Sequence, residues 1–191
     1  MLKKGDTLDV VIDDIRFPNK GIAFGKEGEK ITIKNTLPGQ KIKAVIKKKR
    51  NGRMDAQVIE KLEKAPNEID APCPVFEECG GCTYQNLLYD DQLRLKKKFV
   101  LEILKDFPID GIYEGIEGSK NSFEYRNKME FSFGDAYKNG PLTLGLHKRN
   151  SLYDIVDTSV CMIVDEDFRK ILQAVLSYAK EHEYSYYHKR T

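Results

Sequence analysis

The sequence predicts a mainly β protein with an α+β part. We expect an N-terminal five-stranded OB-like barrel, then a cysteine-rich loop, a helix, and a partial antiparallel sheet with one long helix. Residues 7–62 hold five short apolar stretches separated by turn residues. Residues 73–82 contain three of the four cysteines. Two later stretches repeat apolar residues at helical spacing, with alternating stretches between them.

The expected parts are a small barrel, a cysteine loop, a helix and a sheet domain, over residues 1–64, 65–88, 89–108 and 109–191. A chain of 191 residues suits one large domain or two small ones. No apolar run approaches the length of a membrane span. The N-terminus lacks the apolar stretch of a signal peptide, so we expect a cytoplasmic protein that does not enter a membrane.

The barrel prediction depends on alternation and turns. Leu8, Val10 and Ile12 alternate with the residues between them, which is typical of a half-buried strand. The stretch 37–39 is Leu-Pro-Gly and predicts a turn, and Asn-Gly at 51–52 predicts a tight hairpin. Five strands in about sixty residues favour a small OB-type barrel.

The charge is distributed unevenly along the chain. Residues 1–64 carry 16 Lys/Arg against 9 Asp/Glu, a net charge of +7, whereas residues 65–191 carry 16 against 21, a net charge of −5. A basic first third predicts a module that meets a polyanion such as structured RNA. The alternative is a solvated basic surface.

Candidate RNA contacts in this module gather at one hairpin and in the first loop. The hairpin at 51–52 is crowded by cations that would meet phosphates, namely Lys47, Lys48, Lys49, Arg50 and Arg53. Arg16 and Phe17 place a charge beside an aromatic ring that could stack on a base. For Phe17 the alternative is a loop anchor packed on the barrel.

The cysteine spacing predicts a metal or cluster site. Five residues separate Cys73 from Cys79, two separate Cys79 from Cys82, and Cys161 lies far downstream. Three thiolates in one loop plus a distant fourth is the ligand count of a four-cysteine site. Disulfides and cysteines buried as apolar residues are the alternatives, and a cytosolic chain disfavours disulfides. An all-thiolate set favours a 4Fe–4S cluster, with zinc as the alternative, although structural zinc usually uses two short pairs.

The rest of the chain combines helix and strand patterns. We expect helices over 89–107 and 165–182, strands over 125–133, 142–146 and 153–156, and the start of another strand near 184. The first helix would present Leu93, Val100, Leu104 and Phe107. The first strand would turn to the core Tyr125, Asn127, Met129, Phe131 and Phe133. The last helix would bury Phe168, Ile171, Leu172, Val175, Leu176 and Ala179.

Two of these predicted strands are adjacent and carry further cations. On their faces opposite the core, and just beyond them, they offer Arg126, Lys128, His147, Lys148 and Arg149. We expect these residues to extend the RNA-binding surface. A role for His147 as a metal ligand or general base is disfavoured, because no carboxylate or second histidine is placed with it.

The cysteine loop and the residues after it resemble the iron–sulfur motif of the RNA (uracil-5-)-methyltransferase family. That pattern is Cys-Gly-Gly-Cys, two residues, Gln-His, then Tyr and Gln-Leu leading into a helix. The stretch 79–93 matches it, with Asn86 in place of the histidine. The family's fourth cysteine follows Ile-Val-Asp and precedes Pro-Ile. Here Ile-Val-Asp at 155–157 precedes Cys161, and Met162 replaces the proline, which is not a ligand.

Two other segments are similar to parts of the same family. Gly-Ile-Ala at 21–23 and Leu-Pro-Gly-Gln at 37–40 resemble the TRAM domain, the small RNA-binding barrel of these enzymes. Tyr-Arg-Asn-Lys at 125–128 and the strand at 144–148 resemble its central domain, which helps to grip folded RNA. The resemblance implies a 4Fe–4S cluster on the four cysteines, and structured ribosomal or transfer RNA as partner.

The family transfers a methyl group from S-adenosylmethionine to carbon 5 of a uridine. The resemblance places the S-adenosylmethionine-binding domain, a cysteine nucleophile and a catalytic carboxylate C-terminal to these residues. None of them is recognisable here, so no catalytic residue is predicted and we expect this chain alone to be inactive. The helix over 89–108 would pack on that further domain.

Two other functions stay open at this point. One is a stand-alone, non-catalytic iron–sulfur or zinc protein that binds RNA. The other is a TRAM-containing radical enzyme such as a methylthiotransferase. The latter predicts Cys-x3-Cys-x2-Cys and a C-terminal TRAM domain, and this sequence has neither.

Overall fold

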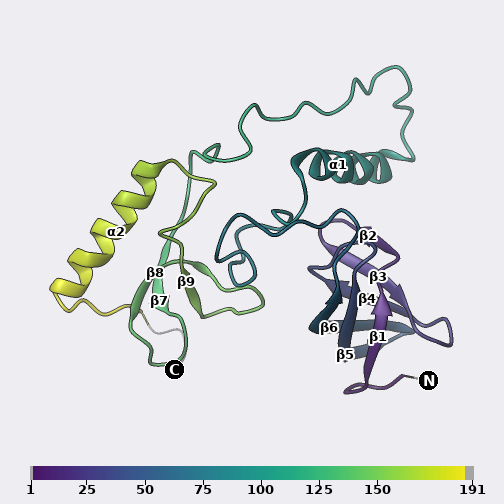
Figure 1. The fold of residues 1–191 in the computed structure, drawn as a ribbon, viewed down its shortest axis with the longest axis horizontal. Helices are drawn as coiled ribbons and strands as arrows, with labels where there is room; N and C mark the ends of the chain where they lie inside the picture. Colours follow the sequence, from purple (N-terminus) through teal and green to yellow (C-terminus); the bar gives the residue numbers. More distant parts are fainter. Residues whose placement is uncertain (1, 188–191) are drawn as a thin grey trace. The chain divides into compact units, whose positions relative to one another are not determined.

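The computed structural model describes residues 2–187 and divides into two compact units (Figure 1). The first unit comprises Met1–Ile69 and Asp90–Gly115, and the second comprises Asp70–Tyr89 and Ile116–Thr191. Within the described residues no helix is long and apolar enough to cross a membrane.

A six-stranded sheet forms the first unit. Its strands are β1 (Thr7–Val11), β2 (Asp14–Arg16), β3 (Lys20–Phe24), β4 (Lys30–Lys34), β5 (Lys41–Arg50) and β6 (Arg53–Glu63). They are ordered β1-β5-β6-β4-β3-β2, and every pair is antiparallel except β4 with β6. The predicted count of five strands is therefore one too low, because Asp14–Arg16 pairs with the start of β3 as a separate short strand.

The apolar positions of these strands fill one core. Its buried members come from all the strands except β2, together with the residue after β1, and are Val10, Ile12, Ala23, Ile31, Ile33, Ile42, Ala44, Ile46 and Met54. The period-two pattern of the sequence is thus confirmed. Gly21 allows close approach at this core, because a Cβ there would lie 2.0 Å from Oγ1 of Thr36.

The β5–β6 hairpin is confirmed at the predicted place. Arg50 pairs with Arg53 across a two-residue turn. Asn51 and Gly52 both have positive φ, 49° and 72°, which is the backbone that this kind of tight turn requires.

Helix α1 (Tyr89–Leu104) begins at the predicted residue and ends three residues before 107. Its one buried side chain is Phe99, whose ring meets Phe17 edge to face at 5.9 Å. Val100 is 36% exposed and Phe107 is 64% exposed, which agrees with the prediction that this apolar face is left uncovered here. Phe99 was not among the predicted apolar residues, and the neighbouring Lys98 forms an ion pair with Asp14 of β2.

A three-stranded antiparallel sheet and a helix form the second unit. Strands β7 (Ser132–Asp135), β8 (Leu142–His147) and β9 (Ile155–Asp157) are neighbours in that order. Helix α2 (Glu166–Glu181) lies beside the sheet (Figure 1). Leu172 and Leu176 pack with Leu144 of β8.

The predicted strand over 125–133 is wrong for most of its length. Only its last two residues belong to β7. The earlier residues bond elsewhere, because the N–H groups of Glu124 and Arg126 donate to the carbonyls of Met162 and Ile163, at 3.0 and 2.9 Å. The expected core face is accordingly broken, and Tyr125 is 54% exposed.

The last helix is confirmed, with a narrower buried face than predicted. Asp165 caps its N-terminus by accepting the N–H of Asp167 at 2.8 Å. Leu172, Leu176 and Ala179 are the buried side chains, whereas Ile171 and Val175 are exposed. No strand forms over residues 184–187, and the remainder of that prediction lies outside the described residues.

Candidate functional site

The cysteine loop is bound to the end of β8 by backbone hydrogen bonds. The Gly80 N–H donates to the His147 carbonyl at 2.9 Å, and the Arg149 N–H donates to the Glu78 carbonyl at 2.6 Å. Glycine is required at position 80, because a Cβ there would lie 2.9 Å from the His147 oxygen. The Cys-Gly-Gly-Cys motif is therefore fixed to the sheet.

Arg149 holds this loop from inside. Its Nη2 donates to the carbonyls of Phe76 at 2.9 Å, Cys79 at 3.2 Å and Cys82 at 2.8 Å. The guanidinium also lies over the Phe76 ring, 5.0 Å from its centre. We predicted an RNA contact for Arg149, and the structure instead turns its guanidinium into the cysteine loop.

Cys161 is fixed in a similar way from helix α2. Arg169 donates through Nη1 to the carbonyls of Cys161 and Val164, at 3.1 and 3.2 Å. Its Nη2 also pairs with Glu124 at 3.2 Å. One arginine thus orders each of the two cysteine-bearing segments. The sequence reasoning missed Arg169, since a cation on a polar helix face carries no signal of such a contact.

The charges of the four cysteines influence one another. Cys79 and Cys161 are buried, Cys73 and Cys82 are half-buried, and all four are free thiols. Burial raises the pKa of the Cys82 thiol, and the charges of Cys161, Cys79 and Cys73 raise it further. Cys82 packs against the buried cluster of Cys161, Ile163 and Val164, so the two cysteine-bearing segments meet here.

Two N–H groups point at the sulfurs. The Gly81 backbone N–H lies 3.3 Å from Sγ of Cys79, and the Gln85 side-chain amide lies 3.2 Å from Sγ of Cys82. Both contacts lower the pKa of these thiols against the effect of burial, because a donor stabilises the thiolate. Gln85 belongs to the sequence motif, but the motif did not predict its contact with the Cys82 sulfur.

No group of three or more metal-ligating side chains is arranged around a single ion in residues 2–187. A structural zinc site needs all its sulfurs at about 2.3 Å from one point. In a 4Fe–4S cluster each thiolate binds a different iron, so its sulfurs lie farther apart.

Tyr125 borders the cysteines. Burial raises the pKa of its hydroxyl, and the thiolate charges of Cys82 and Cys161 raise it further. Tyr84 follows the loop directly, and burial raises the pKa of its hydroxyl to about 12. Both phenols therefore stay protonated at neutral pH beside the thiols.

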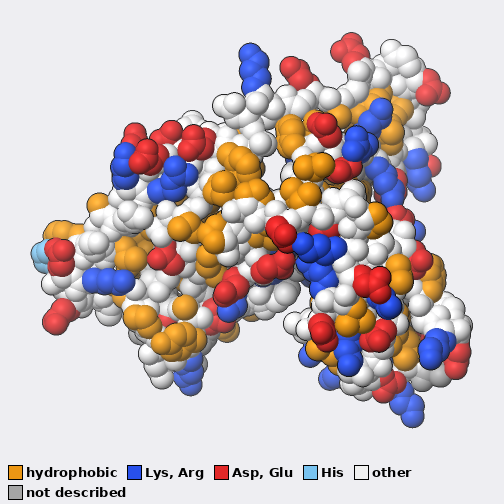
Figure 2. Space-filling model, viewed as in Figure 1, with side chains coloured by type: hydrophobic (Ala, Val, Ile, Leu, Met, Phe, Trp, Pro, Cys, Tyr) orange, Lys and Arg blue, Asp and Glu red, His pale blue; other side chains and the backbone are white. Residues whose placement is uncertain are grey.

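The predicted RNA contacts of the first unit are solvent-exposed. Lys47, Lys48, Arg50 and Arg53 are exposed at the end of the β5–β6 hairpin, and Lys49 donates to the Leu2 carbonyl at 3.0 Å. Arg16 is exposed and Phe17 is 61% exposed, even though one edge of its ring meets Phe99. On the face drawn in Figure 2 basic and acidic side chains are interspersed.

The predicted cations of the second unit do not form one continuous face. Arg126 and Lys128 are exposed outside the strands and line a hollow with Gly81 and Leu146. Lys128 pairs with Glu130 at 2.9 Å. His147 is exposed at the end of β8, and Lys148 pairs with Glu78 at 2.9 Å.

Comparisons with known proteins identify relatives along the whole chain. A protein of Clostridium tetani named as an RNA methyltransferase is 43% identical over 187 residues, which are 97% of this chain and 41% of that protein. Its namesake in Clostridium acetobutylicum is 44% identical over 98% of this chain and 41% of its own length. One in Caldanaerobacter subterraneus is 41% identical over the whole chain and 42% of its length. No family model matches.

The chain belongs to the RNA methyltransferase family. It spans about two fifths of the length of the curated relatives that it matches. A solved structure has the same fold: the Pyrococcus abyssi tRNA (uracil-54, C5)-methyltransferase in complex with S-adenosyl-L-homocysteine, with a TM-score of 0.60. At 21% identity it covers 92% of this chain and 37% of that one.

Proposed function

We propose that this chain is the RNA-recognising, 4Fe–4S-binding part of an S-adenosylmethionine-dependent RNA methyltransferase that acts on carbon 5 of a uridine. One observation carries the cluster half of the proposal. Cys82 packs against the buried cluster around Cys161, which lies almost eighty residues further along the chain, and each of the two segments is clamped by its own arginine. Thiol donors on ordered backbone are suited to a cluster with a structural role.

In this proposal Cys73, Cys79, Cys82 and Cys161 hold the cluster, one thiolate for each iron. The cluster would join the cysteine loop to the segment after β9. Gly81 and Gln85 would stabilise the negative sulfurs through the N–H groups that already contact them. Arg149 and Arg169 would fix the backbone that carries the ligands.

The RNA half of the proposal rests on the family and on the hairpin. Cations at the end of β5 and β6 extend into solvent, where they can reach phosphates without large rearrangement. Arg16 and Phe17 would add a charged and a stacking contact in the same unit. Residues 1–64 would act as the TRAM module, and 109–191 as part of the central domain.

The substrate and methyl donor are inferred from the named neighbour. That enzyme acts on a uracil at carbon 5 of a tRNA and was solved with S-adenosyl-L-homocysteine. We propose the same reaction for the whole protein, with ribosomal or transfer RNA as substrate. The residues described here would bind and orient the RNA, and the S-adenosylmethionine site would lie in another domain.

Anaerobic purification tests the cluster. The expected protein is brown and contains about four iron and four sulfide per chain. Cys161→Ser should lose the iron, whereas Met162→Leu, a matched change of the adjacent residue, should keep it. Zinc in place of iron, at one per chain, would refute the cluster and support the stand-alone zinc protein.

A further inference from the structure

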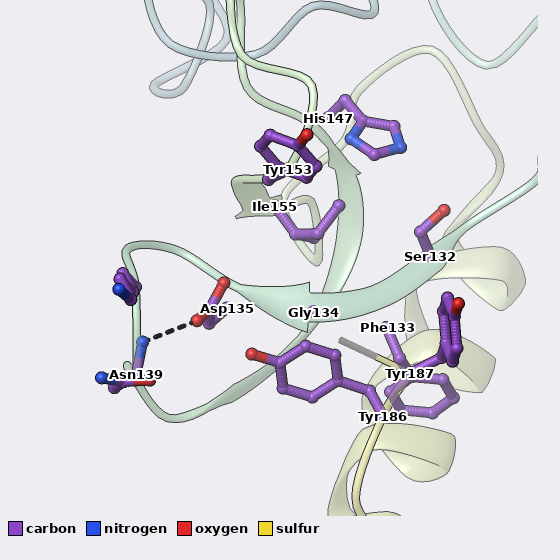
Figure 3. Close-up of a pocket in the computed structure, with 11 residues that line it drawn as sticks. Ser132, Phe133, Gly134, Asp135, Asn139, His147, Tyr153, Ile155, Tyr186 and Tyr187 are labelled. Atoms are coloured by element: carbon purple, nitrogen blue, oxygen red, sulfur yellow. Dashed lines mark hydrogen bonds between the residues drawn. The ribbon is translucent and has the colours of Figure 1, made fainter. Parts of the chain in front are cut away.

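A hollow of about 70 Å³ lies beside strand β7 in the second unit (Figure 3). Phe133 and Asp135 line it from β7, Lys138 from the β7–β8 turn, and Tyr153 from the segment before β9. Tyr186 and Tyr187 line it from the segment that follows α2. The hollow is separate from the cysteine site. Of the cations discussed above, His147 also lines it.

Aromatic rings dominate this hollow, and several are exposed. Phe133 is 41% exposed, Tyr153 is 44% exposed and Tyr187 is 85% exposed. Figure 3 shows Tyr186 and Tyr187 close to Phe133 on one side of the hollow. Exposed ring faces of this kind are stacking platforms for nucleobases, since every base has a flat apolar face.

A buried carboxylate gives the hollow its polarity. Asp135 is 6% exposed, and its Oδ2 accepts the Asn139 N–H at 2.9 Å. Asp135 is among the residues that line the hollow. A carboxylate accepts hydrogen bonds and donates none, so a ligand must present N–H groups to it.

Guanine is the base that best meets this requirement. Its N1–H and 2-amino groups are adjacent donors, and two parallel N–H bonds to one carboxylate are strong and directional. Adenine and cytosine each place an acceptor beside their amino group, which the carboxylate would repel. Uracil has a single N–H between two carbonyl oxygens.

The charges at the rim favour a nucleotide over a cationic ligand. An aromatic cage with a carboxylate can also bind a quaternary ammonium group. Lys138 lines the same hollow and would oppose a cation, whereas it could meet the phosphate that accompanies a base.

We propose that this hollow, between β7 and Tyr186–Tyr187, binds one unpaired guanine of the RNA. The inference rests on the proposed function, because it names a base within the RNA that this chain would recognise. Tyr187 and Phe133 stack on the base, Asp135 accepts its N1–H and 2-amino hydrogens, and Lys138 meets the neighbouring phosphate.

Fluorescence anisotropy with labelled five-nucleotide RNAs tests the proposal on the cluster-loaded chain. UUGUU should bind about fivefold to tenfold more tightly than UUUUU or UUAUU, because it adds two charge-assisted hydrogen bonds. Replacing guanosine by inosine removes the 2-amino group and should reduce the preference for UUGUU over UUUUU. Asp135→Asn should bring UUGUU and UUUUU within twofold of each other.

Substitutions at Tyr187 test the stacking contact separately from the hydrogen bonds that distinguish the bases. Tyr187→Ala should weaken all these RNAs about fivefold, and Tyr187→Phe should restore them, because the ring and not the hydroxyl stacks. Tyr184→Ala, an exposed tyrosine outside the hollow, is the matched control and should change nothing. Far-ultraviolet circular dichroism of each variant confirms that the fold is kept.

Structured RNA distinguishes the two possible failures. If a folded RNA binds with steep salt dependence but the five-nucleotide RNAs bind alike, or Asp135→Asn keeps the guanine preference, the guanine site is refuted and the proposed function stands. If no RNA binds at all, both are refuted. Tighter binding of tetramethylammonium than of guanosine monophosphate would show that the hollow is a cation cage instead.

Discussion

Replacing Arg149 by methionine should loosen the cysteine loop and release the cluster. The substitution keeps an apolar stem near Phe76 but removes a charged donor from three carbonyls, of Phe76, Cys79 and Cys82. A hydrogen bond from a charged group contributes about 1.5–3 kcal/mol. Since one Nη2 atom serves all three acceptors, we count about two full bonds, and expect a loss of about 3–6 kcal/mol in the stability of the second unit.

The assay is urea unfolding of the cluster-loaded chain under nitrogen, followed by the cluster absorbance and by far-ultraviolet circular dichroism. Arg149→Lys keeps the charge without the planar fork and should fall between the wild type and Arg149→Met. Lys148→Met is the matched control, because its ion pair with Glu78 is exposed and contributes about 0–1 kcal/mol. A loss below about 1 kcal/mol in Arg149→Met, with iron release as slow as in the control, would refute the reasoning.

Three further predictions concern the first unit. Changing Lys47, Lys48, Lys49 and Arg50 to glutamine should reduce the slope of log RNA affinity against log salt concentration by about 2–4. The same change at Lys26, Lys30 and Lys34 is the control and should leave the slope unchanged. Equal slopes in both variants would exclude the hairpin as the RNA-binding site. Gly21→Ala should cost about 1–3 kcal/mol in urea unfolding, because its Cβ would lie 2.0 Å from Oγ1 of Thr36, and an unchanged midpoint would contradict this. Burial raises the pKa of the Glu68 carboxyl, but the hydrogen bonds from Lys61, Gln40 and the Ala65 N–H lower this pKa overall below 4.5. The stabilising effect of the carboxylate is therefore present above about pH 4.5 and is lost as the pH falls through the folded pKa. Glu68→Gln should make the urea midpoint less sensitive to acid between pH 6 and 3, and parallel curves for the variant and the wild type would refute this.

Local patterns in the sequence predicted the first unit well. Alternation and the turn signals at 37–39 and 51–52 predicted five of the six strands, since each depends on neighbours in the chain. The short strand Asp14–Arg16 was missed because three residues give no period to detect. Glu68 was also missed: its carboxylate accepts from Gln40 and Lys61, 28 and 7 residues away, and nothing in its own surroundings announces those partners.

The second unit was harder to predict because its bonds join distant segments. The stretch 125–133 alternates as a strand does, yet the Glu124 and Arg126 N–H groups find acceptors in the loop after Cys161. Tertiary hydrogen bonds decided that structure over local pattern. The cluster role of the four cysteines stays a prediction from their spacing. An arginine has many possible roles, and Arg149 was therefore interpreted as an RNA contact.

The two arginines explain how both cysteine-bearing segments are ordered without disulfides. Each segment contains carbonyls that do not pair within a helix or strand, and a buried carbonyl without a donor is costly. Arg149 and Arg169 satisfy these carbonyls, and Arg149 also brings positive charge close to the Cys79 thiol. The same contacts therefore lower the free energy needed to order the loops and, in the proposed cluster site, to bring negatively charged thiolates together. A lysine at either position could supply the charge but not bond several carbonyls at once, so the geometry of the guanidinium is what links the fold to the proposed cluster.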